Sequence, residues 1–168
     1  MTSSTTSPAL PAGVTLREAT ERDIAAMMEV VNAAFDEESF FVNRPRTHQA
    51  ELAEHFRSGH FLLAHQGALL LASAYYEVRG ERGYMGMLAV RPGHQCSGLG
   101  RAMMQAVEGI LRDSGCRIAE LSVVDLRTRL LRTYLKLGYR EAGFVELPEE
   151  LRRKLTMPVQ LIKMEKQL

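Results

Sequence analysis

The chain has 168 residues, the size of one ordinary domain and too short for two full ones. Apolar residues make up 46% and charged residues 24%, a balance that is typical of soluble globular proteins and excludes a disordered chain. Lys and Arg number 21 against 20 Asp and Glu, so the formal net charge of +1 gives no support to binding of nucleic acid or of a membrane surface. The two cysteines, Cys96 and Cys116, form neither a disulfide framework nor a zinc pattern.

The chain lacks targeting and membrane signals. Its longest apolar stretches, 61–64 and 68–72, are too short to span a bilayer. The first basic residue is Arg17, so the charged start of a signal peptide is missing. We therefore expect a cytoplasmic protein with one domain over 14–168, behind a disordered tail over 1–13 that is rich in Ser, Thr and Pro.

The N-terminal half predicts a strand, two amphipathic helices and three further strands. The alternation around Val14 and Leu16 is typical of a half-buried strand. Thr20 followed by Asp23 resembles a capping box and begins a helix. Apolar spacing and turn residues give the rest: a helix whose inner face is Ile24, Met27, Met28, Val31, Ala34 and Phe35, a helix near Thr47–Arg57, and strands at Phe61–His65, Ala68–Val78 and Tyr84–Val90.

The C-terminal half alternates helices with strands. The predicted elements are a helix with the inner face Ala102, Met103, Ala106, Val107, Ile110 and Leu111, a strand at Ile118–Val124, a helix at Thr128–Leu137, and strands at Tyr139–Val145 and Val159–Lys166. A meander followed by a strand–helix–strand crossover predicts an α/β fold with a mixed, largely antiparallel sheet of about seven strands and helices on both faces.

The loop Gln95–Gly100 is the most informative segment, since it joins a strand to the start of a helix. Glycines allow backbone N–H groups to approach a ligand closely, and a helix N-terminus attracts an anion such as phosphate. No Lys-Ser/Thr pair follows the glycines, which excludes a nucleoside-triphosphate P-loop. Met103 stands where a dinucleotide-binding fingerprint needs its third glycine. On the loop alone, an ordinary turn remains the alternative.

The loop also fits the acyl-CoA pyrophosphate pattern Gln/Arg-x-x-Gly-x-Gly, as Gln95-x-x-Gly98-x-Gly100. A second segment, 134–139, reads Tyr-Leu-Lys-Leu-Gly-Tyr. With both segments in this order and spacing, the chain resembles the GNAT superfamily of acyl-CoA-dependent N-acyltransferases over about residues 14–166. The resemblance implies that the sheet splays at an acyl-CoA slot between the strands 84–90 and 118–124.

The resemblance also implies roles for individual residues, with acetyl-CoA as co-substrate. Tyr134 matches the general acid, and a phenol with a reference pKa of about 10 can protonate a leaving thiolate. The strand Leu88–Val90 would pair with pantetheine and aim an N–H at the thioester, while the loop would bind the pyrophosphate. The implied cofactor-binding residues are Leu88, Ala89, Val90, Gln95, Cys96, Ser97, Gly98, Leu99, Gly100 and Arg101.

Two departures from the family pattern leave questions open. Arg127 and Leu130 stand where many members carry an asparagine and a small residue, and Arg127 either contacts a CoA phosphate or is solvated. The strand 84–90 holds no carboxylate, so the general base is Glu77, Glu120 or a chain of water molecules.

The acceptor side is less specific. The segment Asp36–Arg44 contains three acids followed by Phe40 and Phe41, which would attract and cover a primary amine, or would cap a helix and pack into the core. The charged segment 148–154 is an exposed turn or short helix, an edge of the substrate site, or a homodimer contact. We expect an N-acetyltransferase that needs no metal and works by direct attack in a ternary complex. The alternative is a non-catalytic acyl-CoA-binding regulatory module.

Overall fold

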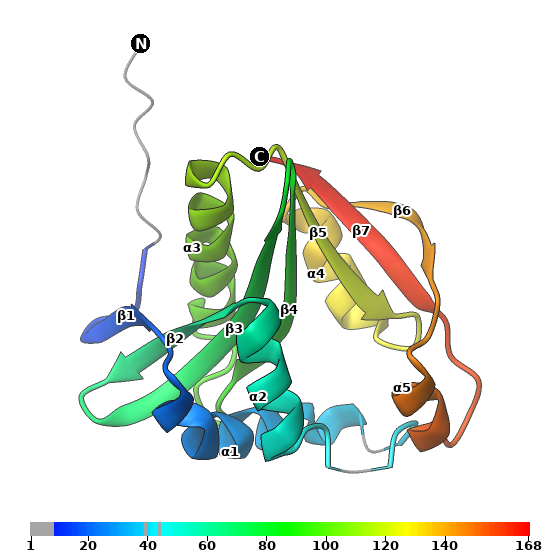
Figure 1. Cartoon of the computed structure of the whole chain (residues 1–168), viewed down its shortest axis with the longest axis horizontal. Coiled ribbons are helices and arrows are strands. Elements are labelled where there is room, and N and C mark those ends of the chain that lie inside the picture. Colours follow the sequence, from blue (N-terminus) through cyan, green and yellow to red (C-terminus); the bar gives the residue numbers. More distant parts are fainter. Residues whose placement is uncertain (1–8, 39, 44) are drawn as a thin grey trace.

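The computed structural model describes residues 9–168 except Ser39 and Arg44, and leaves the side chains of Glu37 and Glu38 undescribed (Figure 1). Seven strands form one sheet in the order β1-β2-β3-β4-β5-β7-β6. Only β4 and β5 pair in parallel, so the predicted mixed, largely antiparallel sheet is confirmed. The strands are β1 (Val14–Glu18), β2 (His60–Gln66), β3 (Leu69–Arg79), β4 (Arg82–Val90), β5 (Ile118–Val124), β6 (Arg140–Val145) and β7 (Leu161–Gln167).

Helices cover both faces of the sheet, as predicted. One core cluster joins α1 and α2 to the sheet through Met27, Val31 and Leu52, and another joins α3 and α4 to it through Met103 and Tyr134. The helices are α1 (Ile24–Ala34), α2 (Gln49–Ser58), α3 (Leu99–Asp113), α4 (Thr128–Lys136) and α5 (Glu149–Lys154), with 3-10 turns at η1 (Glu21–Asp23) and η2 (Phe35–Glu38). No helix in this described part of the chain is both long and apolar enough to cross a membrane.

The predicted capping box holds the entrance to α1. The backbone N–H of Thr20 donates to Asp23 Oδ2 over 2.8 Å, and Asp23 N–H donates back to Thr20 O over 2.9 Å. Arg17 also pairs with Asp23 over 2.7 Å. The hydrogen bond from Arg17 is the main reason that the pKa of the Asp23 carboxyl lies below its ordinary value.

One core contact was not predicted from the apolar spacing of α3. Ala106 and Ile110, expected to face inward, are half-buried, whereas Glu108 is 5% exposed. Its carboxylate accepts hydrogen bonds of 2.8 Å from the hydroxyl of Tyr139 and from Lys166 Nζ. A buried charge is tolerated when it is paired and hydrogen-bonded, and a hydrophobicity pattern cannot reveal such partners.

The N-terminal tail is described only from residue 9 onward. Residues 1–8 of the predicted disordered tail lie outside the described residues. Of the remainder, Leu10 packs against the core, and Gln66 Nε2 donates to Ala12 O over 3.2 Å.

The sheet opens at its centre, between β4 and β5. The parallel ladder joins only Arg82–Tyr84 to Ile118–Glu120, after which the two strands diverge (Figure 1). On the other edge of β4 the register to β3 shifts between Ser73 and Tyr75, so β4 carries a bulge at 87–88. Met87 has a φ of 47° there, in the left-handed region. The splayed slot implied by the family resemblance is therefore present.

Candidate active site

A cavity of about 1110 Å³ occupies the slot. Side chains and backbone of β4 and β5 line its two sides. The start of α3, the loop before it and α4 contribute a second group of lining residues, and α2 and α5 contribute a third. The cavity therefore joins the segments expected to hold the cofactor to segments that the sequence analysis did not link with one another.

The glycine loop brings part of the predicted cofactor-binding set to the cavity. Gly98 lies immediately before α3 and has a φ of 82°. This is the left-handed backbone conformation, which favours glycine. Gln95 Nε2 donates to Val90 O over 3.2 Å, so this side chain links the loop to β4. The predicted residues that line the cavity are Leu88, Val90, Gln95, Cys96, Gly100, Arg101 and Tyr134.

The other predicted cofactor-binding residues lie beside the cavity rather than in its wall. Ala89 and Leu99 are each 1% exposed and belong to the two core clusters. The hydroxyl of Ser97 donates to His94 O over 2.6 Å, which braces the loop. For Ala89, Ser97, Gly98 and Leu99 a contact with a ligand would therefore be made by the backbone, and this remains a prediction.

Basic side chains line the cavity on the side of α3 and α4, and Arg129 Nη2 lies 3.9 Å from Cys96 Sγ in the glycine loop. Arg101, Arg127, Arg129 and Lys136 all line the cavity, from α3, α4 and the residue before α4. Cations beside a helix N-terminus suit the phosphates of a CoA molecule. Arg127 lines the cavity, and its contact with a CoA phosphate stays a prediction.

Tyr134 lies on α4, is 8% exposed and lines the cavity. Its ring centroid is 6.1 Å from that of Tyr139, just beyond the end of the helix. Gly138 has a φ of 93°, which permits the chain to leave α4 at once and places these two tyrosines in one core cluster. The packing fixes the ring of Tyr134, and its role as general acid stays a prediction.

The two carboxylates named as candidate bases do not line the cavity. Glu77 accepts a hydrogen bond from the Tyr75 hydroxyl and pairs with Arg79 over 2.5 Å. The hydrogen bond from Arg79 is the largest cause that lowers the pKa of Glu77. For Glu120, burial alone would raise the pKa, but hydrogen bonds from Arg82 and Lys163 outweigh it and lower the pKa. A carboxylate with a lowered pKa outside the cavity is a poor proton acceptor for a bound amine.

Three other acids among the described residues line the cavity: Glu51 and Glu54 on α2, which were not predicted, and Glu150 on α5. Glu150 belongs to the charged segment 148–154, for which a short helix and an edge of the substrate site were among the expectations, and this segment forms the short helix α5 beside the cavity. Each of the three acids has a basic neighbour, for example Arg46 at 3.6 Å from Glu51 and Lys154 at 3.2 Å from Glu150. Oε2 of Glu51 is nevertheless buried and accepts no hydrogen bond from any described residue. Acids spread over two short helices carry no local sequence signal, and only the fold brings them together.

The segment Asp36–Arg44 contributes less than expected to this wall. Ser39, Arg44 and the side chains of Glu37 and Glu38 lie outside the described residues. Phe41 is fully buried against Val159 and also lines the cavity, whereas Phe40 is 52% exposed and does not line it. Phe41 therefore packs into the core, as one of the two alternatives expected, and its contact with a bound amine stays a prediction.

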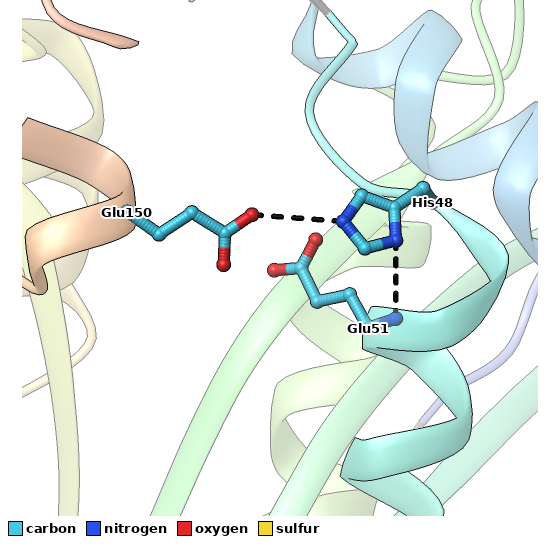
Figure 2. A group of neighbouring side chains, drawn as sticks. All are labelled: His48, Glu51 and Glu150. Atoms are coloured by element: carbon cyan, nitrogen blue, oxygen red, sulfur yellow. Dashed lines mark hydrogen bonds and ion pairs between the residues drawn. The ribbon is translucent and has the colours of Figure 1, made fainter. Parts of the chain in front are cut away.

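His48, Glu51 and Glu150 form a cluster that spans the acceptor wall from α2 to α5 (Figure 2). One ligand atom from each lies within 4.8 Å of the others, which is compatible with a metal ion. However, His48 Nδ1 accepts the backbone N–H of Glu51 over 3.3 Å, so a neutral imidazole carries its proton on Nε2. That N–H faces Glu150 at 3.6 Å, and no lone pair remains there for a metal ion. The cluster therefore suits hydrogen bonding, and the expectation that no metal is needed stays a prediction.

Aromatic rings line the floor of the cavity near the bulge. Tyr75 on β3 pairs with Gly86 on β4, one residue before Met87. A Cβ atom at Gly86 would lie 2.8 Å from the hydroxyl oxygen of Tyr84, so this ring lies over Gly86 and only glycine leaves it room. Tyr75 and Tyr84, with ring centroids 6.3 Å apart, both line the cavity. A bound acceptor would thus meet aromatic surface beside the splayed strands.

Comparisons with known proteins agree with this architecture. The amino-acid acetyltransferase of Pseudomonas putida is 26% identical over 134 residues, which are 79% of this chain but 29% of that protein. This chain therefore spans less than a third of the length of that relative. Among solved structures, the ribosomal-protein-S18-alanine N-acetyltransferase of Escherichia coli has a TM-score of 0.74 at 18% identity, covering 92% of this chain and 93% of that one. The Salmonella typhimurium protein yncA, solved with its cofactor acetyl-CoA, has a TM-score of 0.69 at 19% identity, covering 93% and 94%.

The sequence itself gives the family assignment. The model of the acetyltransferase (GNAT) family matches residues 25–139, which is more than half of the chain. The match includes both the glycine loop before α3 and the tyrosine segment at the end of α4. This chain belongs to the acetyltransferase (GNAT) family.

Proposed function

We propose that the protein is an enzyme that transfers an acetyl group from acetyl-CoA to a primary amine of a small molecule or peptide, by direct attack in a ternary complex. The observation that carries this proposal is the slot. The ladder between β4 and β5 ends at Tyr84 and Glu120, and the cavity there is lined both by the glycine loop and by the acids of α2 and α5.

Acetyl-CoA would bind on the side of the glycine loop. Backbone N–H groups of 96–101 would bind its pyrophosphate, and the four basic side chains nearby would add charge. The backbone of β4 beyond Tyr84 is not paired with β5 and is available to pantetheine. Met87 holds a left-handed conformation that costs about 1–2 kcal/mol, and such strain at a bulge supports a functional role for this turn. An N–H aimed at the thioester oxygen would stabilise the developing charge by about 3 kcal/mol.

The acceptor would bind on the side of α2 and α5. The buried, unpaired Oε2 of Glu51 supports a cationic ligand, because a buried carboxylate oxygen without a partner carries the cost of lost hydration. Arg46 lies 3.6 Å from the same carboxylate and could bind an acidic group on the acceptor. Since one relative is named an amino-acid acetyltransferase, amino acids belong among the amines to be tested.

The protons of the transfer reaction can be followed from nitrogen to sulfur. The ammonium loses one proton before its nitrogen attacks the thioester carbon, and it loses a second as the C–N bond forms and the C–S bond breaks. The departing thiolate gains one proton, which we assign to the hydroxyl of Tyr134, and solvent then reprotonates Tyr134. One proton is released overall for each acetyl group transferred.

The test begins with calorimetry of acetyl-CoA binding, run beside NADH. We expect micromolar binding of acetyl-CoA and none of NADH. A panel of primary amines, amino acids and short peptides is then assayed for release of free thiol. Binding without thiol release for any acceptor would favour the regulatory module, and no binding of acetyl-CoA would contradict both functions.

A further inference from the structure

Two histidines line the cavity, His48 at the N-cap of α2 and His55 within that helix, and the structure holds their neutral forms in opposite tautomers. His48 Nδ1 accepts a backbone N–H, which leaves a proton on Nε2. His55 Nδ1 lies 2.8 Å from Glu51 O, and because a carbonyl only accepts, Nδ1 must donate. The lone pair of neutral His55 is therefore on Nε2, the nitrogen farther from the helix, and no described residue is hydrogen-bonded to it.

His55 lies close to the point where the strands part. Its ring meets the ring of Tyr75 edge to face, with centroids 4.7 Å apart and an interplanar angle of 87°. Tyr75 is the direct partner of Gly86, which precedes the bulge of β4. Tyr75 therefore contacts His55 with its ring and pairs through its backbone with the strand that would present the thioester. A direct contact, or one water molecule, is the reach that general-base catalysis requires.

The charged and titratable groups near His55 come from its own helix and from β3. On its own helix the acids are Glu51, which supplies the carbonyl, and Glu54, which lines the same cavity. On β3 the neighbours are Tyr75 and Glu77, and Glu77 is close enough to interact electrostatically with a charged His55. The charge of the Glu77 carboxylate is already balanced by its ion pair with Arg79 on the same strand.

We propose that His55 is the general base that accepts the first proton from the acceptor's ammonium. The proton passes from the nitrogen to Nε2, directly or through one water molecule, and Nδ1 remains bonded to Glu51 O. The amine then attacks, and the imidazolium releases its proton to solvent through the open side of the cavity. This assignment rests on the proposed acetyl transfer, and it fills a role for which neither Glu77 nor Glu120 is placed.

The test compares the pH dependence of kcat/KM in the wild type with that in His55→Gln and His48→Asn. An imidazole changes its charge between pH 5 and 8, so the wild-type rate should fall on the acidic side of that range. We expect His55→Gln to lower kcat by about 100-fold or more, to abolish the acidic limb and to bind acetyl-CoA with unchanged affinity. Added imidazole should restore part of its rate. His48→Asn, which keeps a side-chain acceptor at the start of α2, should retain the limb.

Each result bears on the proposal even where a variant folds poorly. In the wild type alone, a limb caused by imidazole shifts strongly with temperature, whereas one caused by a carboxylate hardly shifts. A temperature-insensitive limb, or a His55→Gln variant with wild-type kcat and an intact limb, would overturn the role of His55 and leave acetyl transfer standing. A wild-type protein that binds acetyl-CoA but acetylates no amine would overturn the proposed function, and with it this role.

Discussion

The two sides of the cavity are built in different ways. On the proposed cofactor side, one contiguous segment provides the end of β4, the glycine loop and the first turn of α3, and we expect its backbone N–H groups to make most of the contacts with the cofactor. On the acceptor side, the wall combines side chains from α2, α5 and the floor of β3 and β4. Glycines determine the backbone conformation of the cofactor side, whereas the side chains of acids, histidines and aromatic residues form the acceptor side.

This difference affects how easily each side of the cavity can change among proteins with the same fold. A backbone site depends on chain conformation, so a short pattern with Gly98 at a φ of 82° is enough to specify it. A side-chain wall depends on the identity of each residue, and short helices can exchange those residues without changing the fold. We therefore expect that only a few positions on the cofactor side, such as Gly98, cannot be substituted. We expect the side chains of the acceptor side to determine which amine is bound.

The largest expected effect tests Tyr134, the proposed general acid. Tyr134→Phe should lower kcat by about 10²–10⁴-fold, because the thiolate then lacks its proton donor. The ring and its packing beside Tyr139 are kept, so the dissociation constant of acetyl-CoA should remain nearly unchanged. Thiol-release kinetics and calorimetry give the two values, and unchanged turnover would remove Tyr134 from the mechanism.

The cofactor side can be broken by one added side chain. Gly100 lines the cavity, and Gly100→Glu would place a carboxylate beside the pyrophosphate site, so we expect acetyl-CoA affinity to fall by more than about 10-fold, or 1.4 kcal/mol. Gly109→Glu makes the same change farther along α3, where an added Cβ meets no atom within 4 Å. Equal affinities of the two variants would show that the loop does not bind the cofactor.

On the acceptor side, charge removal should act on KM for the amine. Glu51→Gln deletes the charge of the buried oxygen, and a hydrogen bond to a charged group contributes about 1.5–3 kcal/mol, so KM should rise about 10-fold or more. Glu150→Gln should have a smaller effect, because that side chain is 59% exposed. Glu149→Gln, next to it but outside the cavity wall, should leave KM unchanged. The same rise in all three variants would indicate a general effect of charge rather than a site.

The smallest effect concerns stability alone. Asp23→Asn weakens the capping box and its pairing with Arg17, at a cost of about 1 kcal/mol in the free energy of unfolding at pH 7. Because the folded state lowers the pKa of Asp23, this contribution is present above about pH 4, the ordinary pKa of Asp, and fades as the pH falls further. Urea unfolding should therefore show a smaller difference in the free energy of unfolding between the wild type and Asp23→Asn at pH 3 than at pH 7. KM for the amine should be the same in Asp23→Asn as in the wild type. A changed KM would show that the capping box affects the acceptor side of the cavity.

Most elements could be predicted from the sequence because their signals are local. The strand Ile118–Val124 was predicted with its observed bounds, and the capping box of Thr20 and Asp23 is present. Errors fell where tertiary partners override the pattern. Glu108 is buried because Tyr139 and Lys166 satisfy it, and Val30, absent from the predicted inner face of α1, is fully buried.

The candidate site divides in the same way. The position of Tyr134 and of the glycine loop beside the slot could be predicted, since both motifs are contiguous and follow the chain order of the fold. The acids Glu51 and Glu54 could not, and Glu150 could be named only as part of a segment with several possible roles, because about ninety residues separate α2 from α5 and neither helix carries a motif. The base candidates Glu77 and Glu120 were chosen by nearness in sequence, and their ion pairs with Arg79 and Arg82 point them elsewhere.

The sequence by itself determined the family, the mixed sheet, the slot between the fourth and fifth strands and the cofactor loop. The mixed sheet follows from periodicity, and the loop follows from its glycines and a contiguous motif, all of which act over a few residues. The slot follows from the family resemblance that the two motifs give. Only the tertiary structure decided which acids reach the cavity and which tautomer each histidine adopts. Hydrogen bonds to particular backbone atoms fix those tautomers, as His48 at the N-cap of α2 and His55 within that helix show, and such partners exist only once the chain has folded.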